Sequence, residues 1–414
     1  MAKKEKLSTD PYKGVRDLYP EDQAFLRYFA ETARTFVEKV GYVEYGASIL
    51  EPSELYKAKG AENAELASEQ TYTFIDRGER EVTLRPEMTP TVARMVAHKR
   101  RELGFPLRLY SVANFFRYER PQRGRTREFW QLNVDLFGSE SLYADAEILG
   151  MAYGLMKAFG ADDSDFMIKV GSRTWLDMLV TELNLSDAQY RQLKRLLDAK
   201  DKMPVEEFSS KLAELGITKE LILNSEPPAD IQTMLAEFSA AGIGNIVFDP
   251  AIVRGFDYYT GMVFEVFDTH PDNNRALFGG GRYDNLTELF DDEGVMGVGF
   301  AMGNETIYNF LEVRKLLPPY LPTTKLYIAI TSPELAPQAQ TLAGQLRTEG
   351  INVAIDFGDK KLGDQIKNAA KHKIPYLIIV GDAELASGDF IIKDLASGKE
   401  TPLARERLAD FFNN

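Results

Sequence analysis

The run Arg127–Phe137 limits the folds open to this chain more than any other feature, because polar and apolar residues alternate along it. Its sequence, REFWQLNVDLF, puts Arg127, Gln131 and Asp135 on one face and most of the apolar residues on the other. A period of two is the pattern of a β-strand with one buried face. A second strand-like run, Leu107–Tyr118, precedes it. The two predict a hairpin whose polar face borders either solvent or a pocket.

Positive charge is concentrated around the loop of this hairpin. Five arginines lie there: Arg117, Arg120, Arg123, Arg125 and Arg127. The whole chain has a formal charge of −14, from 49 Lys plus Arg and 63 Asp plus Glu, so this local cluster predicts a bound anion. Guanidinium groups bind phosphate through paired hydrogen bonds and stay charged at any working pH. Neither GxxxxGK[ST] nor GxGxxG after a strand occurs, so we expect side chains to hold the phosphate.

Composition excludes several other classes of function. There are no cysteines, which removes disulfides and thiolate chemistry. The only histidines, His98, His270 and His372, are far apart in the sequence, which disfavours a zinc site or a Ser-His-Asp triad. No long apolar run and no apolar leader segment occur, so we expect a cytoplasmic protein without a membrane span. The net negative charge opposes non-specific adhesion to nucleic acid but allows a locally basic surface.

The chain divides into segments of different texture. Expected elements, in chain order, are a helix at Gln23–Val40, strands at Tyr72–Ile75 and Glu81–Leu84, a helix from Thr89 to about Arg101, mostly helical structure between Asp145 and Ile246, and strands within Ile252–Asp268 and Val295–Ala301. Thr89-Pro90 looks like an N-cap followed by proline in the first helical turn. Part of the long helical stretch is interpreted as an inserted module.

The segment Leu316–Thr324, LLPPYLPTT, contains three prolines and predicts a linker between domains. After it, the strand-like KLYIAIT, INVAIDF and PYLIIVG alternate with helical runs at Glu334–Glu349 and Leu362–His372. This βαβαβ order predicts a small α/β domain with a largely parallel sheet.

Three further stretches suggest a site. TLRPEMTPTVAR places Glu87 and Thr89 where a strand leads into a helix, although helix capping would also explain Thr89. IVRGFDYYTGMVFEVFD brings Arg254, Tyr258 and Tyr259 together ahead of a strand. LFGGGRYDNL has three consecutive glycines, which indicate either a tight turn or a close approach to the backbone.

Taken together, these segments resemble the class II aminoacyl-tRNA synthetases, and among them the histidyl-tRNA synthetases. The resemblance is carried in order by GVRDLYP, TLRPEMTPTVAR, FRYERPQRGRTREFWQLNVDLFG, VRGFDYYTG, GGGRYDNL and GVGFAMGNE, and it spans nearly the whole chain. It implies an α+β catalytic domain built on an antiparallel sheet over residues 1–320, with a helical insertion at about 170–245, and an α/β anticodon-binding domain over 324–414. It also implies a homodimer whose interface uses the region Tyr42–Pro52.

The same resemblance implies an activity. Histidine reacts with ATP to give histidyl-adenylate and pyrophosphate, and the 3′ end of tRNA(His) then takes the histidyl group. The matching positions give Arg117 and Arg254 as catalytic residues, and ATP contacts at Arg117, Glu119, Arg125 and Arg254. Histidine contacts fall on Glu87, Thr89, Gln131, Asp135, Tyr258 and Tyr259. Mg²⁺ is expected with ATP, its ligands unassigned.

The chain departs from the family pattern at one position. The third class II motif commonly ends in Gly-x-Glu-Arg, and its arginine contacts the γ-phosphate, whereas this sequence has Thr306 there. Either other arginines hold the triphosphate tail, with Arg125 the first candidate, or the chain activates ATP weakly. The alternative function is that of a non-catalytic relative, the synthetase-like regulatory subunit of ATP phosphoribosyltransferase in histidine biosynthesis. Arg117, Arg125, Arg254 and the C-terminal domain favour the enzyme.

Overall fold

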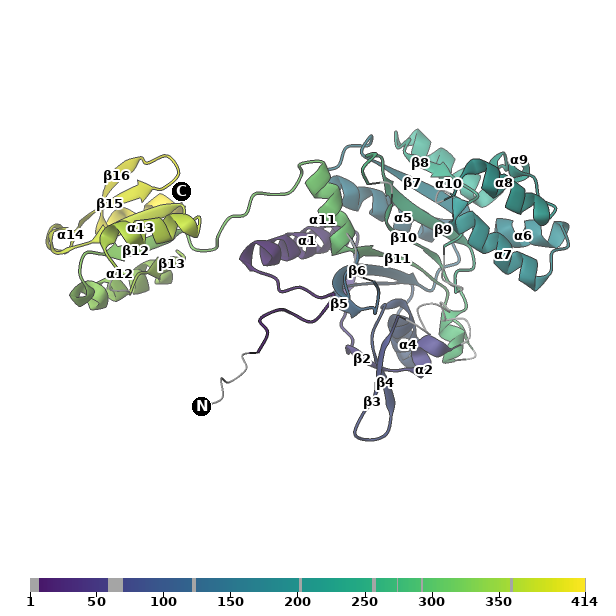
Figure 1. The fold of residues 1–414 in the computed structure, drawn as a ribbon, viewed down its shortest axis with the longest axis horizontal. Coiled ribbons are helices and arrows are strands. Elements are labelled where there is room, and N and C mark those ends of the chain that lie inside the picture. The colour runs from purple at the N-terminus through teal and green to yellow at the C-terminus, as the bar shows by residue number, and fades with distance from the viewer. Residues whose placement is uncertain are drawn as a thin grey trace. The chain divides into compact units, whose positions relative to one another are not determined.

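The computed structural model describes residues 7–58, 70–120, 124–200, 203–254, 258–273, 275–291, 293–357 and 360–413. The chain separates into two compact units, Met1–Leu317 and Pro318–Asn414, each with its own core (Figure 1). Within the described residues, no helix is both long enough and apolar enough to cross a membrane.

A large mixed sheet organises the first unit. In the described residues, its strands follow the spatial order β1 (Val43–Glu44), β5 (Leu107–Phe116), β6 (Glu128–Phe137), β11 (Gly297–Gly303), β10 (Ala276–Arg282), β9 (Met262–Asp268), β7 (Phe166–Ser172) and β8 (Ile246–Phe248). The inner pairs are antiparallel, and only the edge pairs β1/β5 and β7/β8 are parallel. The predicted antiparallel sheet and the predicted hairpin, β5 with β6, are therefore confirmed.

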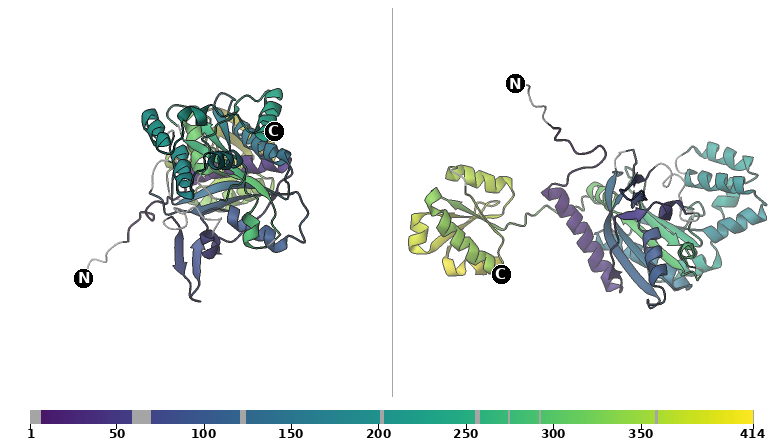
Figure 2. Two further views of the ribbon diagram at one scale, coloured as in Figure 1. Left: turned by 90° about the vertical axis from the view of Figure 1, so that its right-hand side faces the viewer. Right: turned by 90° about the horizontal axis from the view of Figure 1, so that it is seen from below.

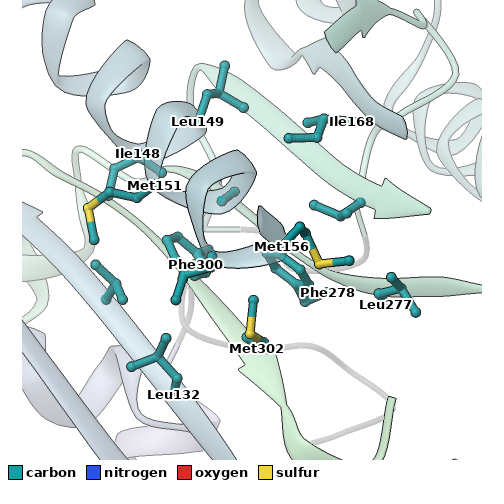
Figure 3. Close-up of a cluster of buried hydrophobic side chains, with 14 of the residues drawn as sticks. Leu132, Ile148, Leu149, Met151, Met156, Ile168, Leu277, Phe278, Phe300 and Met302 are labelled. Carbon is teal, nitrogen blue, oxygen red and sulfur yellow. The ribbon is translucent and has the colours of Figure 1, made fainter. Parts of the chain in front are cut away.

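One face of this sheet is buried under helices. These are α1 (Pro20–Lys39), α5 (Leu142–Ala158), α10 (Ala229–Ala240) and α11 (Asn304–Val313). Figure 3 shows Ile148, Leu149 and Met156 in the same buried cluster as Leu132 and residues of β7, β10 and β11. Because successive side chains of a strand alternate between faces, burying Leu132 on this side turns Gln131 and Asn133 to the other.

The opposite side carries smaller elements. A three-stranded sheet is formed by β2 (Leu50–Pro52), β4 (Glu81–Leu84) and β3 (Tyr72–Ile75), with α2 (Glu54–Lys57), α4 (Thr89–Lys99) and the 3₁₀ turn η2 (Leu286–Leu289) nearby. The β3–β4 hairpin projects from the unit (Figures 1 and 2). Thr89 is the first residue of α4 and Met88 occupies the cap position, so the expected cap at Thr89 is wrong.

A helical module with a separate core follows β7. It consists of α6 (Arg173–Glu182), α7 (Asp187–Asp198), α8 (Val205–Glu214) and α9 (Lys219–Leu223) (Figure 1). The next helix, α10, instead packs on the large sheet through Ile231 and Met234. The sequence interpretation missed the strand β7, which lies inside the stretch expected to be helical.

The second unit contains a five-stranded sheet. Its strands follow the order β13 (Val353–Ile355), β12 (Leu326–Ile330), β14 (Tyr376–Val380), β15 (Asp389–Asp394) and β16 (Glu400–Ala404). The helices are α12 (Ala336–Thr348), α13 (Leu362–Lys371), α14 (Asp382–Ser387) and α15 (Leu408–Asn413), with 3₁₀ turns η3 (Pro333–Leu335) and η4 (Arg405–Arg407). Strand β12 is parallel to β13 and β14, which confirms the predicted βαβαβ core. The antiparallel pair β15/β16 was not predicted.

Candidate active site

A cavity of about 310 Å³ lies against the polar face of the large sheet in the first unit. The predicted residues that line it are Glu87, Thr89, Arg117, Glu119, Arg125, Gln131, Arg254, Tyr258 and Tyr259. These residues come from the start of α4, the loop between β5 and β6, strand β6 and the segment between β8 and β9, up to 172 residues apart in the chain. Only Asp135 among the predicted site residues lies beneath the lining rather than in it.

Strand β6 supplies the floor through its alternating polar face. Gln131 and Asn133 line the cavity, and Asp135 lies deeper, where it accepts a short hydrogen bond from the Tyr283 hydroxyl. Burial raises the pKa of Asp135 to about 7, and the bond from Tyr283 only partly opposes this. Gln131 Oε1, Asn133 Oδ1 and Asp135 Oδ2 have no hydrogen-bond partner among the described residues. The floor therefore presents two buried acceptors, on Gln131 and Asn133, to a ligand that brings donors, and a third lies beneath them on Asp135.

Arg127 does not belong to this floor, although the alternation of β6 put it on the same face. Its side chain turns to the N-terminal segment, where Nη1 donates to the Lys13 carbonyl at 3.0 Å. The guanidinium also stacks on Tyr118, 3.9 Å from the ring centre, and a side chain at Gly14 would collide with it. The Arg127 side chain therefore links the N-terminal segment to the hairpin.

Glycines on β10 and β11 leave space above the floor for neighbouring side chains and for a ligand. A Cβ at Gly279 would lie 2.4 Å from Nη1 of Arg254, and one at Gly281 would lie 2.9 Å from the Tyr259 ring. The three consecutive glycines therefore lie inside a strand, and the tight turn offered as one explanation is wrong. The other explanation, close approach of side chains to the backbone, is confirmed.

Glu87 and Tyr258 form the wall beside this floor. The Tyr258 hydroxyl donates to Glu87 Oε2 at 3.2 Å and also contacts the Thr89 side chain. Burial raises the pKa of Glu87 to about 7, against smaller lowering effects of Arg117, the Tyr258 bond and Arg254. A carboxyl with this pKa changes its ionisation near neutral pH and gains a full charge when a cation binds beside it.

Two arginines face the cavity from different elements. Arg117, just past β5, donates from Nε to the Pro86 carbonyl at 2.9 Å and lies over the Phe129 ring. Arg254 has a left-handed backbone, with φ of 51°, and its Nη1 donates to Glu265 Oε1 at 3.0 Å. Gly255–Asp257, which complete the motif around Arg254, lie outside the described residues.

The outer end of the cavity is formed by the hairpin loop and the start of α11. Arg125 is half exposed and pairs with Glu119 at 3.2 Å. Thr306 lines the cavity and its hydroxyl donates to the Gly303 carbonyl at 3.0 Å. Of the other loop arginines, Arg120 is exposed outside the cavity lining, and Arg123 lies outside the described residues.

The sequence interpretation missed two residues of the site. Tyr283, in the motif GGGRYDNL, lines the cavity and packs against Tyr258 with ring centres 5.9 Å apart. Glu305, beside Thr306, lines the outer end and pairs with Arg16 at 2.9 Å. Tyr283 directly follows the glycine strand, so the sequence motif could have identified it. The ion pair of Glu305 with Arg16 joins residues 289 positions apart, and no local pattern indicates it.

Comparisons with known proteins agree with one another. Residues 14–307 match the family model for histidyl-tRNA synthetase, and residues 325–414 match that for the anticodon binding domain. The chain is 40% identical to the histidine–tRNA ligase of Leptospira biflexa, over 95% of each chain. It is 33% identical to that of Thermococcus kodakarensis, over 97% of each.

Solved structures share the fold. A histidyl-tRNA synthetase from Nostoc sp. PCC 7120 superposes with a TM-score of 0.83 at 24% identity, covering 99% of both chains. An apo S. aureus histidyl-tRNA synthetase gives 0.71 at 26% identity, covering 98% of this chain and 100% of that one. A protein from Bacillus halodurans, described as an ATP phosphoribosyltransferase regulatory subunit/histidyl-tRNA synthetase, gives 0.69 at 22% identity, covering 88% of this chain and 97% of that one.

Proposed function

The chain belongs to the histidyl-tRNA synthetase family, and from this premise we propose how its cavity activates histidine. It is a histidine–tRNA ligase, whose reaction consumes ATP and attaches histidine to tRNA. In the first step, a carboxylate oxygen of histidine attacks the α-phosphorus of ATP, and the bond to the leaving pyrophosphate breaks. The observation that carries the proposal is that one cavity brings Glu87, Gln131, Arg117 and Arg254 together.

Histidine binds at the inner end of the cavity. Its α-ammonium group lies near the carboxylate of Glu87 and the amide of Gln131, and its imidazole ring near Tyr259 and Asp135. Two observations support this orientation: the unpaired acceptors of β6 match the donors of the amino acid, and Glu87 is buried. A polar pocket of this kind rejects apolar side chains strongly, because its own groups would be left unpaired. Thr89 orients Glu87 through their shared partner, Tyr258.

Arg117 and Arg254 act at the reacting centre. Two anions, the histidine carboxylate and the α-phosphate, must come together there, and fixed guanidinium groups offset their repulsion. Arg117 would hold the α-phosphate, and Arg254 both the carboxylate and the phosphate. Most of the gain in rate comes from positioning and from stabilising the charge that develops during in-line displacement. Neither arginine forms a covalent intermediate.

The outer end of the cavity holds the triphosphate tail. Arg125 is half exposed, and its ion pair in the described part of the chain is with Glu119, so the guanidinium is able to turn to the phosphates. Mg²⁺ would arrive with ATP, since this ion favours phosphate oxygens, water and one or two carboxylates. Glu119 and Glu305 are carboxylates of the cavity lining that fit this donor set. Bound there, the ion would neutralise part of the phosphate charge.

The second unit, from about residue 324, is proposed to bind the anticodon of tRNA(His), and the match of residues 325–414 to the anticodon binding domain supports this. The first unit, to about residue 320, would carry out both chemical steps, with α6–α9 as an insertion. As an enzyme of protein synthesis, the chain would act in the cytoplasm.

A homodimer is proposed through the three-stranded sheet and β1. Several large apolar side chains there are exposed: Val43, Ile49, Leu50, Phe74 and Ile75, between 38% and 64%. β1, β2 and β3 are edge strands in the described residues, and large apolar side chains left exposed on or beside such strands support an interface there. Replacing Ile75 by glutamate would convert the dimer to a monomer in sedimentation-velocity experiments. A wild-type chain that sediments as a monomer at micromolar concentration would contradict the proposal.

Histidine-dependent exchange of pyrophosphate into ATP tests the proposed function. We expect exchange with histidine and none with leucine or glutamine, followed by transfer of histidine to tRNA(His). Tight histidine binding without exchange would instead favour the regulatory subunit of ATP phosphoribosyltransferase. The retained Arg117, Arg125 and Arg254 and the anticodon-binding match argue for the enzyme.

A further inference from the structure

The segment leading to Arg254 is held against the end of β7. Asp249 donates its backbone N–H to the Val170 carbonyl at 2.8 Å. Two residues before α6, Gly171 lies so close to this segment that a Cβ there would be 2.0 Å from the Ile252 carbonyl oxygen. Strand β7, which directly precedes the helical module, therefore fixes the path of the chain toward Arg254.

Side chains of the same segment anchor it on two sides. Ala251 and Val253 belong to the hydrophobic core of α6–α9, and both are at least 94% buried. Ile252, between them, packs in the cluster that contains Tyr258 and Tyr259. The segment thus joins the helical module to the proposed histidine pocket, with alternate side chains in each.

Arg173, the first residue of α6, forms hydrogen bonds with the chain on both sides of the proposed histidine pocket. It is only 3% exposed, and its Nη2 donates to the Arg254 carbonyl at 3.3 Å. Its own backbone N–H donates to the Gly261 carbonyl at 2.9 Å. One buried arginine therefore contacts the chain at Arg254 and again just beyond Tyr258 and Tyr259.

The backbone at Arg254 needs such support. Its φ of 51° lies in the left-handed region, which a residue with a Cβ adopts only at a cost in free energy. Relaxation to an ordinary conformation would redirect the side chain, which reaches Glu265 Oε1 at 3.0 Å and borders the cavity. Arg173 itself lies outside the lining of that cavity as far as the described residues define it.

We infer that Arg173 is a positioning residue that holds Arg254 in its left-handed conformation and so aims its guanidinium at the reacting centre. The inference rests on the proposed role of Arg254. It also gives the module α6–α9 a part in the activation step, because its first helix carries Arg173 and its core holds Val253. Misplacing a charged group by about 1 Å is enough to lower a rate by about 100-fold.

Single variants at Arg173 provide the first test. Arg173→Met should lower kcat of histidine-dependent pyrophosphate exchange by about 10- to 100-fold. KM for ATP and for histidine should change by less than about threefold, as expected when an interaction of the transition state is lost. Arg173→Lys keeps a buried positive charge and one donor, so it should recover part of kcat. Arg191→Met, at an exposed arginine of α7, is the matched control and should behave as wild type.

A double-mutant cycle with Arg254→Lys separates positioning from general structural support. If Arg173 acts through Arg254, Arg173→Met should change the kcat of Arg254→Lys by less than about threefold. Thermal unfolding shows whether each variant is folded, and Arg173→Lys takes the place of Arg173→Met in the cycle if the latter does not fold.

Two results would overturn the inference alone: an equal loss of kcat from the Arg173 variant in both backgrounds, or a wild-type kcat for that variant while Arg254→Lys is impaired. A wild-type kcat for Arg254→Lys would overturn the proposed role of Arg254 and the inference together.

Discussion

Ionisation of Glu87 is expected to control how tightly the enzyme binds histidine near neutral pH. Burial raises the pKa of this carboxyl from its ordinary 4.5 to about 7. In the proposed site, the α-ammonium group of histidine pairs with the ionised form, so binding must remove the proton wherever the carboxyl is neutral. Affinity for histidine should therefore increase as the pH rises through 7.

The size of the effect follows from the pKa. A carboxyl with a pKa of about 7 is ionised in about one molecule in eleven at pH 6 and about ten in eleven at pH 8. If only the ionised form binds, Kd for histidine falls about tenfold between these values because of Glu87. Asp135, whose pKa is also about 7, adds a second factor of up to about ten if the imidazole requires it ionised.

Isothermal titration calorimetry at pH 6, 7 and 8 measures this dependence. Repeating it in buffers with different ionisation enthalpies counts the protons released on binding. Glu87→Gln should remove about a tenfold part of the pH dependence, and Asp135→Asn isolates the second carboxyl. The imidazole of free histidine also titrates in this range, but it contributes equally to wild type and variant. A Glu87→Gln variant with the full pH dependence of the wild type would refute the reasoning.

Three other changes have defined outcomes. Arg254→Ala should lower histidine-dependent pyrophosphate exchange by about 100-fold or more with the circular dichroism unchanged; wild-type turnover would mean that the site is misassigned. Gly281→Ala would put a Cβ 2.9 Å from the Tyr259 ring and 2.6 Å from the Met262 carbonyl oxygen. KM for histidine should therefore rise and the melting temperature should fall, and unchanged values of both would refute the close packing. Thr306→Arg should leave exchange unchanged or lower KM for ATP; a large loss would show that the outer end of the cavity depends on the threonine.

The elements predicted best are those whose side-chain period is set by one buried face. The hairpin β5–β6 and the strands β3 and β4 lie where the sequence predicted them, because the alternation of polar and apolar residues is a local property. The βαβαβ order of the second unit was predictable for a different local reason, because short, nearly continuous apolar runs such as β12, which is buried along its whole length, alternate with helical runs. These strands need no information about distant partners.

The strand β10 was not predicted, because glycine has no side chain to pack and disfavours extended structure in isolation. It is a strand because β9 and β11 pair with it on both edges and supply hydrogen bonds along its length. Arg127 is a similar case. Its alternation with Gln131 is correct, yet its guanidinium is directed away from the cavity by a hydrogen bond to the Lys13 carbonyl, 114 residues away.

The site arises from the register of three strands, which no local pattern contains. Asp135 on β6 is paired with Gly299 on β11, which is paired with Gly281 on β10. In the next row toward the cavity mouth, Asn133 faces Ala301, which faces Gly279. Each polar side chain of β6 therefore stands beside residues with little or no side chain, and the space they leave becomes the pocket. Shifting β11 by one residue would set Phe300 beside Asp135 and fill it. The binding site therefore forms only when the arginine-rich hairpin and the glycine strand, some 150 residues apart in the sequence, are aligned through β11.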